Sequence, residues 1–159
     1  MSFLAKEDFL TVLASTPLVS IDLIIRNAND AILLGRRRNE PAKDYLFVPG
    51  GRIRKDETLE EAFARLTQHE LGRRYTIEAA KLKGAYTHKY TNNALGVPGV
   101  STHYVVLGYE LCVDAEELDL SEQHTEVRWL AWDELQRDPE LAPQVHPNVL
   151  PYFPRAESA

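Results

Sequence analysis

The stretch VPGGRIRKDETLEEAFARLTQHELG, from Val48 to Gly72, decides the fold of this chain. Two glycines, Gly50 and Gly51, follow the apolar run YLFV and precede a segment whose apolar residues recur every three or four positions. This order predicts a strand, a close turn and then a helix over residues 57–71. Asp56 is the predicted N-cap of that helix, and Gly72 is predicted to stand just beyond its C-terminus.

The predicted helix carries one carboxylate in an unexpected place. On a helical wheel, Leu59, Ala62, Phe63 and Leu66 form one apolar stripe, which is the face that docks on a sheet. Glu70 follows Leu66 by four positions and therefore falls within this stripe. A carboxylate there is costly unless a cation or hydrogen bonds satisfy it. Either the last turn emerges into solvent, or Glu70 binds a metal ion, for which Mg²⁺ is suited because it prefers oxygen ligands.

Runs rich in β-branched and aromatic residues surround this segment and predict strands at 18–26, 31–38, 45–48, 76–90, 101–113 and 125–132. Helical patterns are found at 6–13 and 132–137. Strands mixed with few helices predict an α/β or α+β fold built in layers. The segment 138–159 carries five prolines, which predict turns and a loose tail with His146 in solvent.

Composition narrows the class of protein. A chain of 159 residues with 26% charged residues is expected to form one domain, residues 1–159, with residues 1–16 as an N-terminal arm. The net charge of −6 argues against nucleic acid as a partner. The single cysteine excludes a disulfide framework. Without a signal peptide or an apolar run of membrane-spanning length, we expect a cytoplasmic protein that does not engage the membrane.

At the helix, the chain resembles the Nudix hydrolases. Gly51, Glu57, Arg65, Glu70 and Gly72 match the family signature in register. The resemblance implies a Nudix-like α/β/α sandwich with a mixed sheet. Typical members break a phosphoanhydride with several divalent ions held by glutamates. Two of those glutamate positions are occupied here by other residues, Leu66 and His69.

With these two replacements, the chain resembles one branch of the family, the GDP-mannose mannosyl hydrolases. The likeness extends from about Phe3 to Trp132 and includes the runs LLGRR, VPGGR, THYVVLGY and EQH. It implies hydrolysis of GDP-mannose, or of GDP-glucose, to GDP and the free sugar by water attack at the anomeric carbon. Mg²⁺ is the implied cofactor, with Mn²⁺ as a substitute. A Nudix pyrophosphatase that cleaves the diphosphate of a nucleotide sugar is the alternative, and a non-catalytic binding module is a third hypothesis.

The resemblance also implies roles for residues far from the helix. His124 is the expected general base, and a histidine near neutral pKa suits that task. Gln123, Glu70 and the backbone carbonyl of Gly50 form the expected metal set. Tyr104 is expected to help bind the diphosphate, and His88 the sugar together with Tyr90. Phe3, Leu4 and Phe9 are expected either to contact guanine across a homodimer or to anchor the arm on the domain.

Three charged residues stand out from the pattern itself. We expect Arg37 and Arg52 to bind the diphosphate, because guanidinium groups match phosphate oxygens. Asp22 interrupts the apolar run LVSIDLII, and a charge inside such a strand is a candidate for a functional site. We expect Asp22 to orient substrate hydroxyls or the phosphate-binding groups.

Overall fold

The computed structural model describes residues 4–120 and 126–154. Three of the expected site residues, Phe3, Gln123 and His124, lie outside these ranges. The described chain contains the helices α1 (Lys6–Ser15), α2 (Leu59–Leu71) and α3 (Trp132–Arg137). It also contains four short 3₁₀ helices: η1 (Ile77–Ala79), η2 (Ala115–Glu117), η3 (Ala142–Gln144) and η4 (Pro147–Tyr152).

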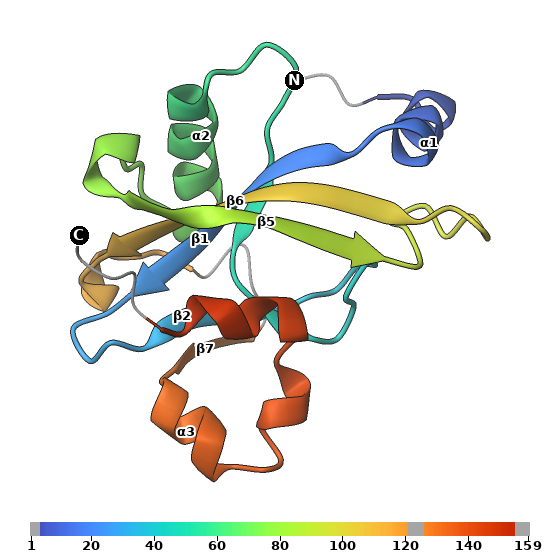
Figure 1. Cartoon of the computed structure of the whole chain (residues 1–159). Coiled ribbons are helices and arrows are strands. Elements are labelled where there is room, and N and C mark those ends of the chain that lie inside the picture. The colour runs from blue at the N-terminus through green and yellow to red at the C-terminus, as the bar shows by residue number, and fades with distance from the viewer. Residues whose placement is uncertain (1–3, 121–125, 155–159) are drawn as a thin grey trace.

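One mixed sheet forms the middle of the molecule (Figure 1). Its strands run in the order β3–β2–β1–β6–β5, while β4 pairs with β1 and β7 pairs with β2. Strands β1 and β6 are parallel, and all other pairs are antiparallel. The strands are β1 (Leu18–Arg26), β2 (Ile32–Arg36), β3 (Leu46–Phe47), β4 (Gly50–Arg52), β5 (Lys81–Tyr90), β6 (Thr102–Cys112) and β7 (Val127–Leu130).

The central strand β1 separates two hydrophobic cores. Successive side chains of a strand point to opposite faces, so Ile21, Leu23 and Ile25 share one face of β1. These three pack with Phe63 and its neighbours on α2, whereas Ile24 packs on the other face with the C-terminal segment. Figure 1 shows α2 on one side of the sheet, with α3 and η4 on the other. The predicted α/β/α sandwich with a mixed sheet is therefore confirmed.

Helix α2 begins two residues later than the sequence pattern indicated. Asp56 adopts a left-handed backbone with φ of 68°, whereas an N-cap requires an extended conformation. Thr58 caps the helix instead, and its side chain forms a capping box with Glu61. Leu59 is 40% exposed and so does not belong to the docked stripe. Gly72 ends the helix with a φ of 72°, as predicted for a C-terminal glycine.

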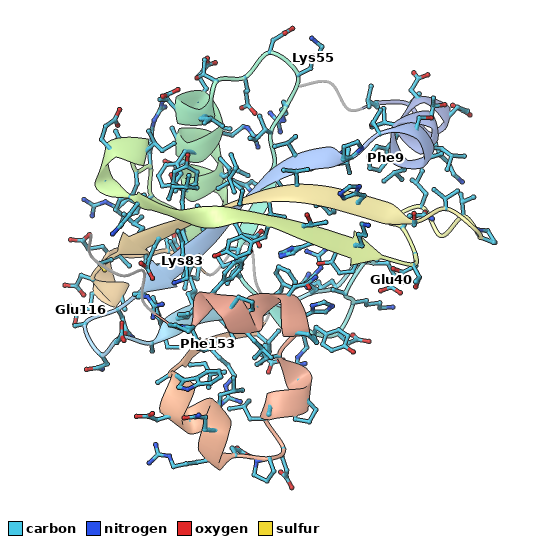
Figure 2. The ribbon with its side chains drawn as sticks, viewed as in Figure 1. Phe9, Glu40, Lys55, Lys83, Glu116 and Phe153 are labelled. Atoms are coloured by element: carbon cyan, nitrogen blue, oxygen red, sulfur yellow. The ribbon has the colours of Figure 1, made fainter. Side chains whose placement is uncertain are left out.

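The proline-rich C-terminal segment packs against the sheet instead of forming a loose tail. Val145, Val149, Tyr152 and Phe153 are all buried in the core beneath β1 and β2. Prolines are tolerated in the first turn of a helix, where no internal hydrogen bond is lost, and η3 and η4 both use them there. Figure 2 shows Phe153 where η4 ends, on the side of the sheet opposite α2.

Further element boundaries also differ from the prediction, since several strands are shorter by one or two residues at an end. The predicted strand over 76–90 begins with the 3₁₀ turn η1, and β5 starts only at Lys81. The first helix continues to Ser15, where Thr16 and Pro17 end it. Within residues 4–120 and 126–154, every helix is too short or too polar to cross a bilayer.

Candidate active site

A cleft of about 310 Å³ lies where strands β1, β2, β5 and β6 meet the turn before α2. Its wall contains residues from distant parts of the sequence, because the sheet order places β6 directly beside β1 and β5 beside β6. Eight of the expected site residues line this one cleft: Asp22, Arg37, Gly50, Arg52, Glu70, His88, Tyr90 and Tyr104. Their individual roles remain predictions, although their convergence identifies the candidate site.

The floor of the cleft depends on a close approach of two strands. Gly50 of β4 lies opposite Asp22 of β1 in the antiparallel pair. A Cβ atom added to Gly50 would lie 2.2 Å from the carbonyl oxygen of Ile21, so only glycine fits there. Gly51 makes a similar approach to Leu66 of α2, at 2.7 Å from a side-chain carbon. The glycine pair therefore brings the strand, the helix and the cleft floor together.

Asp22 is a buried acid with a defined partner. Its carboxylate is 7% exposed, and its Oδ2 accepts a hydrogen bond of 2.7 Å from the hydroxyl of Tyr152. Burial raises the pKa of Asp22 to about 7, while the Tyr152 hydrogen bond and the charge of Arg37 act in the opposite direction.

Arginines dominate the charge of the cleft. Among the described residues, the lining contains four arginines and two carboxylates: Arg36, Arg37, Arg38 and Arg52, with Asp22 and Glu70. Arg37 donates from Nε to the carbonyl of Pro41 at 2.8 Å, and the guanidinium of Arg52 lies 4.5 Å from the ring centre of Phe9. Such a concentration of positive charge on a chain with net charge −6 favours an anionic ligand.

Arg36 is held by several polar contacts to its neighbours. It forms an ion pair with Glu126 through Nε and Nη2, and it donates to Gln144 at 2.8 Å. Arg36 and Arg38 both line the cleft, although strand alternation alone would direct their side chains away from the side of Arg37. Arg36 thereby fixes the chain at Glu126, where β2 and the beginning of β7 run side by side.

Glu70 is the one carboxylate of α2 that lines the cleft among the described residues. Its side chain is 15% exposed, so the last turn does not simply emerge into solvent. Glu57 is engaged elsewhere, because Arg65 donates to both of its oxygens at 2.7 and 2.8 Å. Leu66 is 3% exposed within the α2 core, where it offers no ligand atom.

This donor set suits one hard cation better than a cluster. In residues 4–120 and 126–154, no group of three or more His, Cys, Asp or Glu side chains is arranged to hold a metal ion. Mg²⁺ commonly takes one or two carboxylates and completes its shell with water and substrate phosphates. Glu70 and the Gly50 carbonyl, on one wall of a cleft rich in arginine, fit that description.

Aromatic residues form another part of the cleft lining. His88 is 4% exposed and makes edge contacts with Phe47, at 6.1 Å between ring centres. Burial, with a smaller effect of His146, lowers the pKa of His88 to about 4, so the imidazole is neutral at pH 7. Burial raises the pKa of Tyr104, and the charges of Arg52 and Arg37 offset part of this rise. The phenol therefore keeps its proton and can donate a hydrogen bond to an anion.

The N-terminal arm reaches the edge of the cleft through one residue. Phe9 of α1 stacks on Arg52, and Figure 2 shows α1 at one side of the molecule with Phe9 directed toward the sheet. Leu4 is 56% exposed and does not line the cleft. The arm therefore contacts a cleft residue within a single chain, while guanine contacts across a homodimer stay a prediction.

The sequence interpretation missed the contribution of the C-terminal segment. Tyr152 bonds to Asp22, and Asn148 donates to the hydroxyl of Tyr90 at 3.2 Å. His146 is not in open solvent but packs against Phe47 and Tyr90, with ring centres 5.5 Å away in both cases. The apolar residues spaced between the prolines were the available signal for this packing.

The depressed pKa of His88 leads to a stability prediction. The unfolded chain gains a proton on this imidazole as the pH falls below about 6.5, whereas the folded chain resists protonation until about pH 4. Wild-type stability is therefore fully present above pH 6.5 and is lost as the pH falls toward 4. We expect the free energy of unfolding of His88→Gln to fall by roughly 2 kcal/mol less than that of the wild type over this pH range, measured by urea unfolding at several pH values. Lys89→Gln, at the next and exposed position, should keep the wild-type profile, and an equal loss in His88→Gln and wild type would contradict the prediction.

Comparison with known proteins agrees with this architecture. The family model described as NUDIX domain matches residues 16–153, and the chain therefore belongs to the Nudix hydrolases. The low-salt glycan biosynthesis protein Agl8 of Haloferax volcanii is 38% identical over 123 residues, which cover 77% of this chain and 76% of that protein.

Solved structures share the fold at low sequence identity. The MutT protein of Methanosarcina mazei Go1 superposes with a TM-score of 0.65 at 21% identity, covering 87% of this chain and 92% of that one. A bifunctional NMN adenylyltransferase/ADP ribose pyrophosphatase of Francisella tularensis, complexed with AMP and a manganese ion, superposes with a TM-score of 0.57 at 17% identity. It matches over 88% of this chain and 43% of that one. As a Nudix hydrolase, the chain acts on a diphosphate compound, and enzymes of this family generally use divalent metals such as Mg²⁺ or Mn²⁺.

Proposed function

We propose that this enzyme hydrolyses GDP-mannose, or GDP-glucose, to GDP and the free sugar, with water attacking the anomeric carbon. One observation carries the proposal: the arginines of the cleft converge with a single carboxylate of α2, Glu70, while Leu66 is buried at a position where Nudix enzymes of the usual kind hold metal. With the described residues, such a site can neutralise a diphosphate but offers too few ligands for a multi-metal attack on phosphorus.

The chemistry follows from the leaving group. A nucleoside diphosphate leaves readily once its charge is neutralised, so little acid assistance is needed at the glycosidic oxygen. Arg37 and Arg52 bind the diphosphate oxygens, and Tyr104 donates a hydrogen bond to them. Glu70, Gln123 and the Gly50 carbonyl would hold Mg²⁺ or Mn²⁺, which would supply further positive charge to neutralise the diphosphate.

The remaining roles concern water, sugar and base. His124 accepts the proton of the attacking water, and Asp22 orients the phosphate-binding groups through its position beside Arg37. His88 and Tyr90 contact the sugar. Phe3, Leu4 and Phe9 contribute to the guanine site of a homodimer, with residues 1–159 as one Nudix domain. The glycan biosynthesis named for the Haloferax relative agrees with a substrate that is a nucleotide sugar.

A second candidate is cleavage of the diphosphate itself, as in a Nudix pyrophosphatase. Membership of the family supports this candidate more directly than the first, since one structural neighbour is named as an ADP ribose pyrophosphatase. The donor set in the cleft speaks for the first candidate, because Leu66 and the Glu57–Arg65 ion pair remove the neighbouring carboxylates from the site.

Hydrolysis of GDP-mannose in ¹⁸O-water distinguishes the candidates. We expect GDP without label and mannose with label at the anomeric oxygen, measured by mass spectrometry at short times. Mannose incubated alone in ¹⁸O-water corrects for spontaneous exchange. GMP and mannose 1-phosphate, with label in one of them, would support the pyrophosphatase. Label in the β-phosphate of GDP, with unlabelled mannose, would mean attack at phosphorus with the sugar as leaving group and would contradict both candidates. Absence of turnover would support a binding module.

A further inference from the structure

Tyr152 joins the C-terminal segment to the active-site cleft. Its side chain is fully buried at the end of η4 and does not line the cleft. Its hydroxyl nevertheless donates to Oδ2 of Asp22 at 2.7 Å, and Asp22 does line the cleft. A residue from the last part of the chain thus acts on the site through one hydrogen bond.

The backbone at Tyr152 is held by a second residue of β1. Arg26 is 1% exposed, and its Nη2 donates to the carbonyl oxygens of Tyr152 and Phe153 at 2.8 Å each. Its Nε donates to Glu110 of β6 at 2.5 Å. A buried guanidinium is tolerated only when its donors are paired in good geometry, so this arrangement has little freedom to shift.

The two residues that hold Tyr152, Asp22 and Arg26, lie on the same face of β1. Asp22 and Arg26 are four positions apart on β1 and therefore point to the same side of the sheet. Asp22 receives the side chain of Tyr152, and Arg26 holds its main chain. The Tyr152 ring is confined further by Tyr86, which meets it edge-on at 5.1 Å between ring centres.

A second hydrogen bond also joins η4 to a residue that lines the cleft. Asn148, near the start of η4, donates to the hydroxyl of Tyr90, another residue that lines the cleft. Asn148 and Tyr152, the two polar side chains of η4 that face the sheet, therefore both donate hydrogen bonds to residues that line the cleft. An element that served packing alone would need only Val149 and its apolar neighbours.

We propose that Tyr152 is a positioning residue of this active site, which holds the Asp22 carboxylate in the orientation that catalysis requires. A buried carboxylate without a fixed donor can rotate, whereas a hydrogen bond to a charged group fixes one oxygen and frees the other for the cleft. The C-terminal segment is then part of the catalytic apparatus through Tyr152. The inference rests on the proposed function only in that Asp22 takes part in the reaction.

The test compares Tyr152→Phe with a packing control in the same element. Tyr152→Phe keeps the ring and removes the hydroxyl, so we expect kcat to fall by about tenfold or more while KM stays within about twofold. Val149→Ala leaves a cavity in η4 without touching a polar contact of the cleft. It should lower the melting temperature at least as much as Tyr152→Phe, yet keep kcat within about twofold.

A double-mutant cycle separates positioning from general damage. In the Asp22→Asn background, Tyr152→Phe should change kcat by less than about twofold, because the residue acts through Asp22. If Tyr152→Phe lowers kcat by the same factor with and without Asp22→Asn, the two residues act independently and the proposal is overturned. An unchanged kcat in Tyr152→Phe alone would also overturn it. Crystal structures of the wild type and Tyr152→Phe provide a readout without turnover, and an unmoved Asp22 carboxylate would also count against it. If the wild type cleaves a different bond or diphosphate, the proposed function fails, and the same cycle is run on that reaction.

Discussion

Glu70→Gln is expected to lower kcat/KM by about 100-fold at low magnesium and to raise the magnesium concentration that gives half-maximal rate. Glutamine keeps the size of the side chain and one carbonyl oxygen but removes the charge that attracts a divalent cation. Glu70 is the carboxylate of α2 that lines the cleft, since Glu57 is bound to Arg65. The loss should therefore not be compensated by a neighbour on the helix.

The measurement is the initial rate as a function of magnesium concentration for three proteins. Glu60→Gln changes the same charge on an exposed part of α2 and should follow the wild-type curve. If Glu70→Gln also follows it, the metal is held elsewhere in the cleft and the role given to Glu70 is wrong. Thermal unfolding checks that all three proteins are folded.

Much of the fold and of the cleft could be predicted because local signals and spacing agree. The apolar, β-branched run LVSIDLIIR predicts a strand, and the single acid within it indicates a functional site. The structure places Asp22 on that strand in the cleft. Gly50 and Gly72 were found for similar reasons, because each occupies a backbone position that other residues fit badly.

Other features depend on contacts that no local pattern contains. The left-handed backbone of Asp56 excludes it as the N-cap of α2, and Thr58 is the N-cap instead. Both Asp and Thr are common N-cap residues, so the residue type alone does not distinguish them. The prolines of the C-terminal segment predict a loose tail, but the apolar residues between them pack into the core. Arg26 lies in an apolar strand and gives no sign of its partners, since Tyr152 is separated from it by 126 positions.

His124→Gln is expected to lower kcat by about 10²–10⁴-fold with little change in KM, as for the loss of a general base. Neither Leu66 nor the carboxylate bound to Arg65 can replace the imidazole, so hydroxide or a poorly placed water must then react. His103→Gln, on β6 beside Tyr104, is the matched control and should stay near the wild-type rate.

A second variant tests whether the imidazole itself performs the step. His124→Ala should recover part of its activity when imidazole is added to the assay, because a free base can enter the space left by the side chain. The part of the wild-type pH dependence that comes from the imidazole should disappear in His124→Gln, while the part that comes from Asp22 should remain. A His124→Gln enzyme with nearly full kcat would mean that another group activates the water. The buried Asp22 would then be the first alternative to examine, because its pKa of about 7 suits a base at neutral pH.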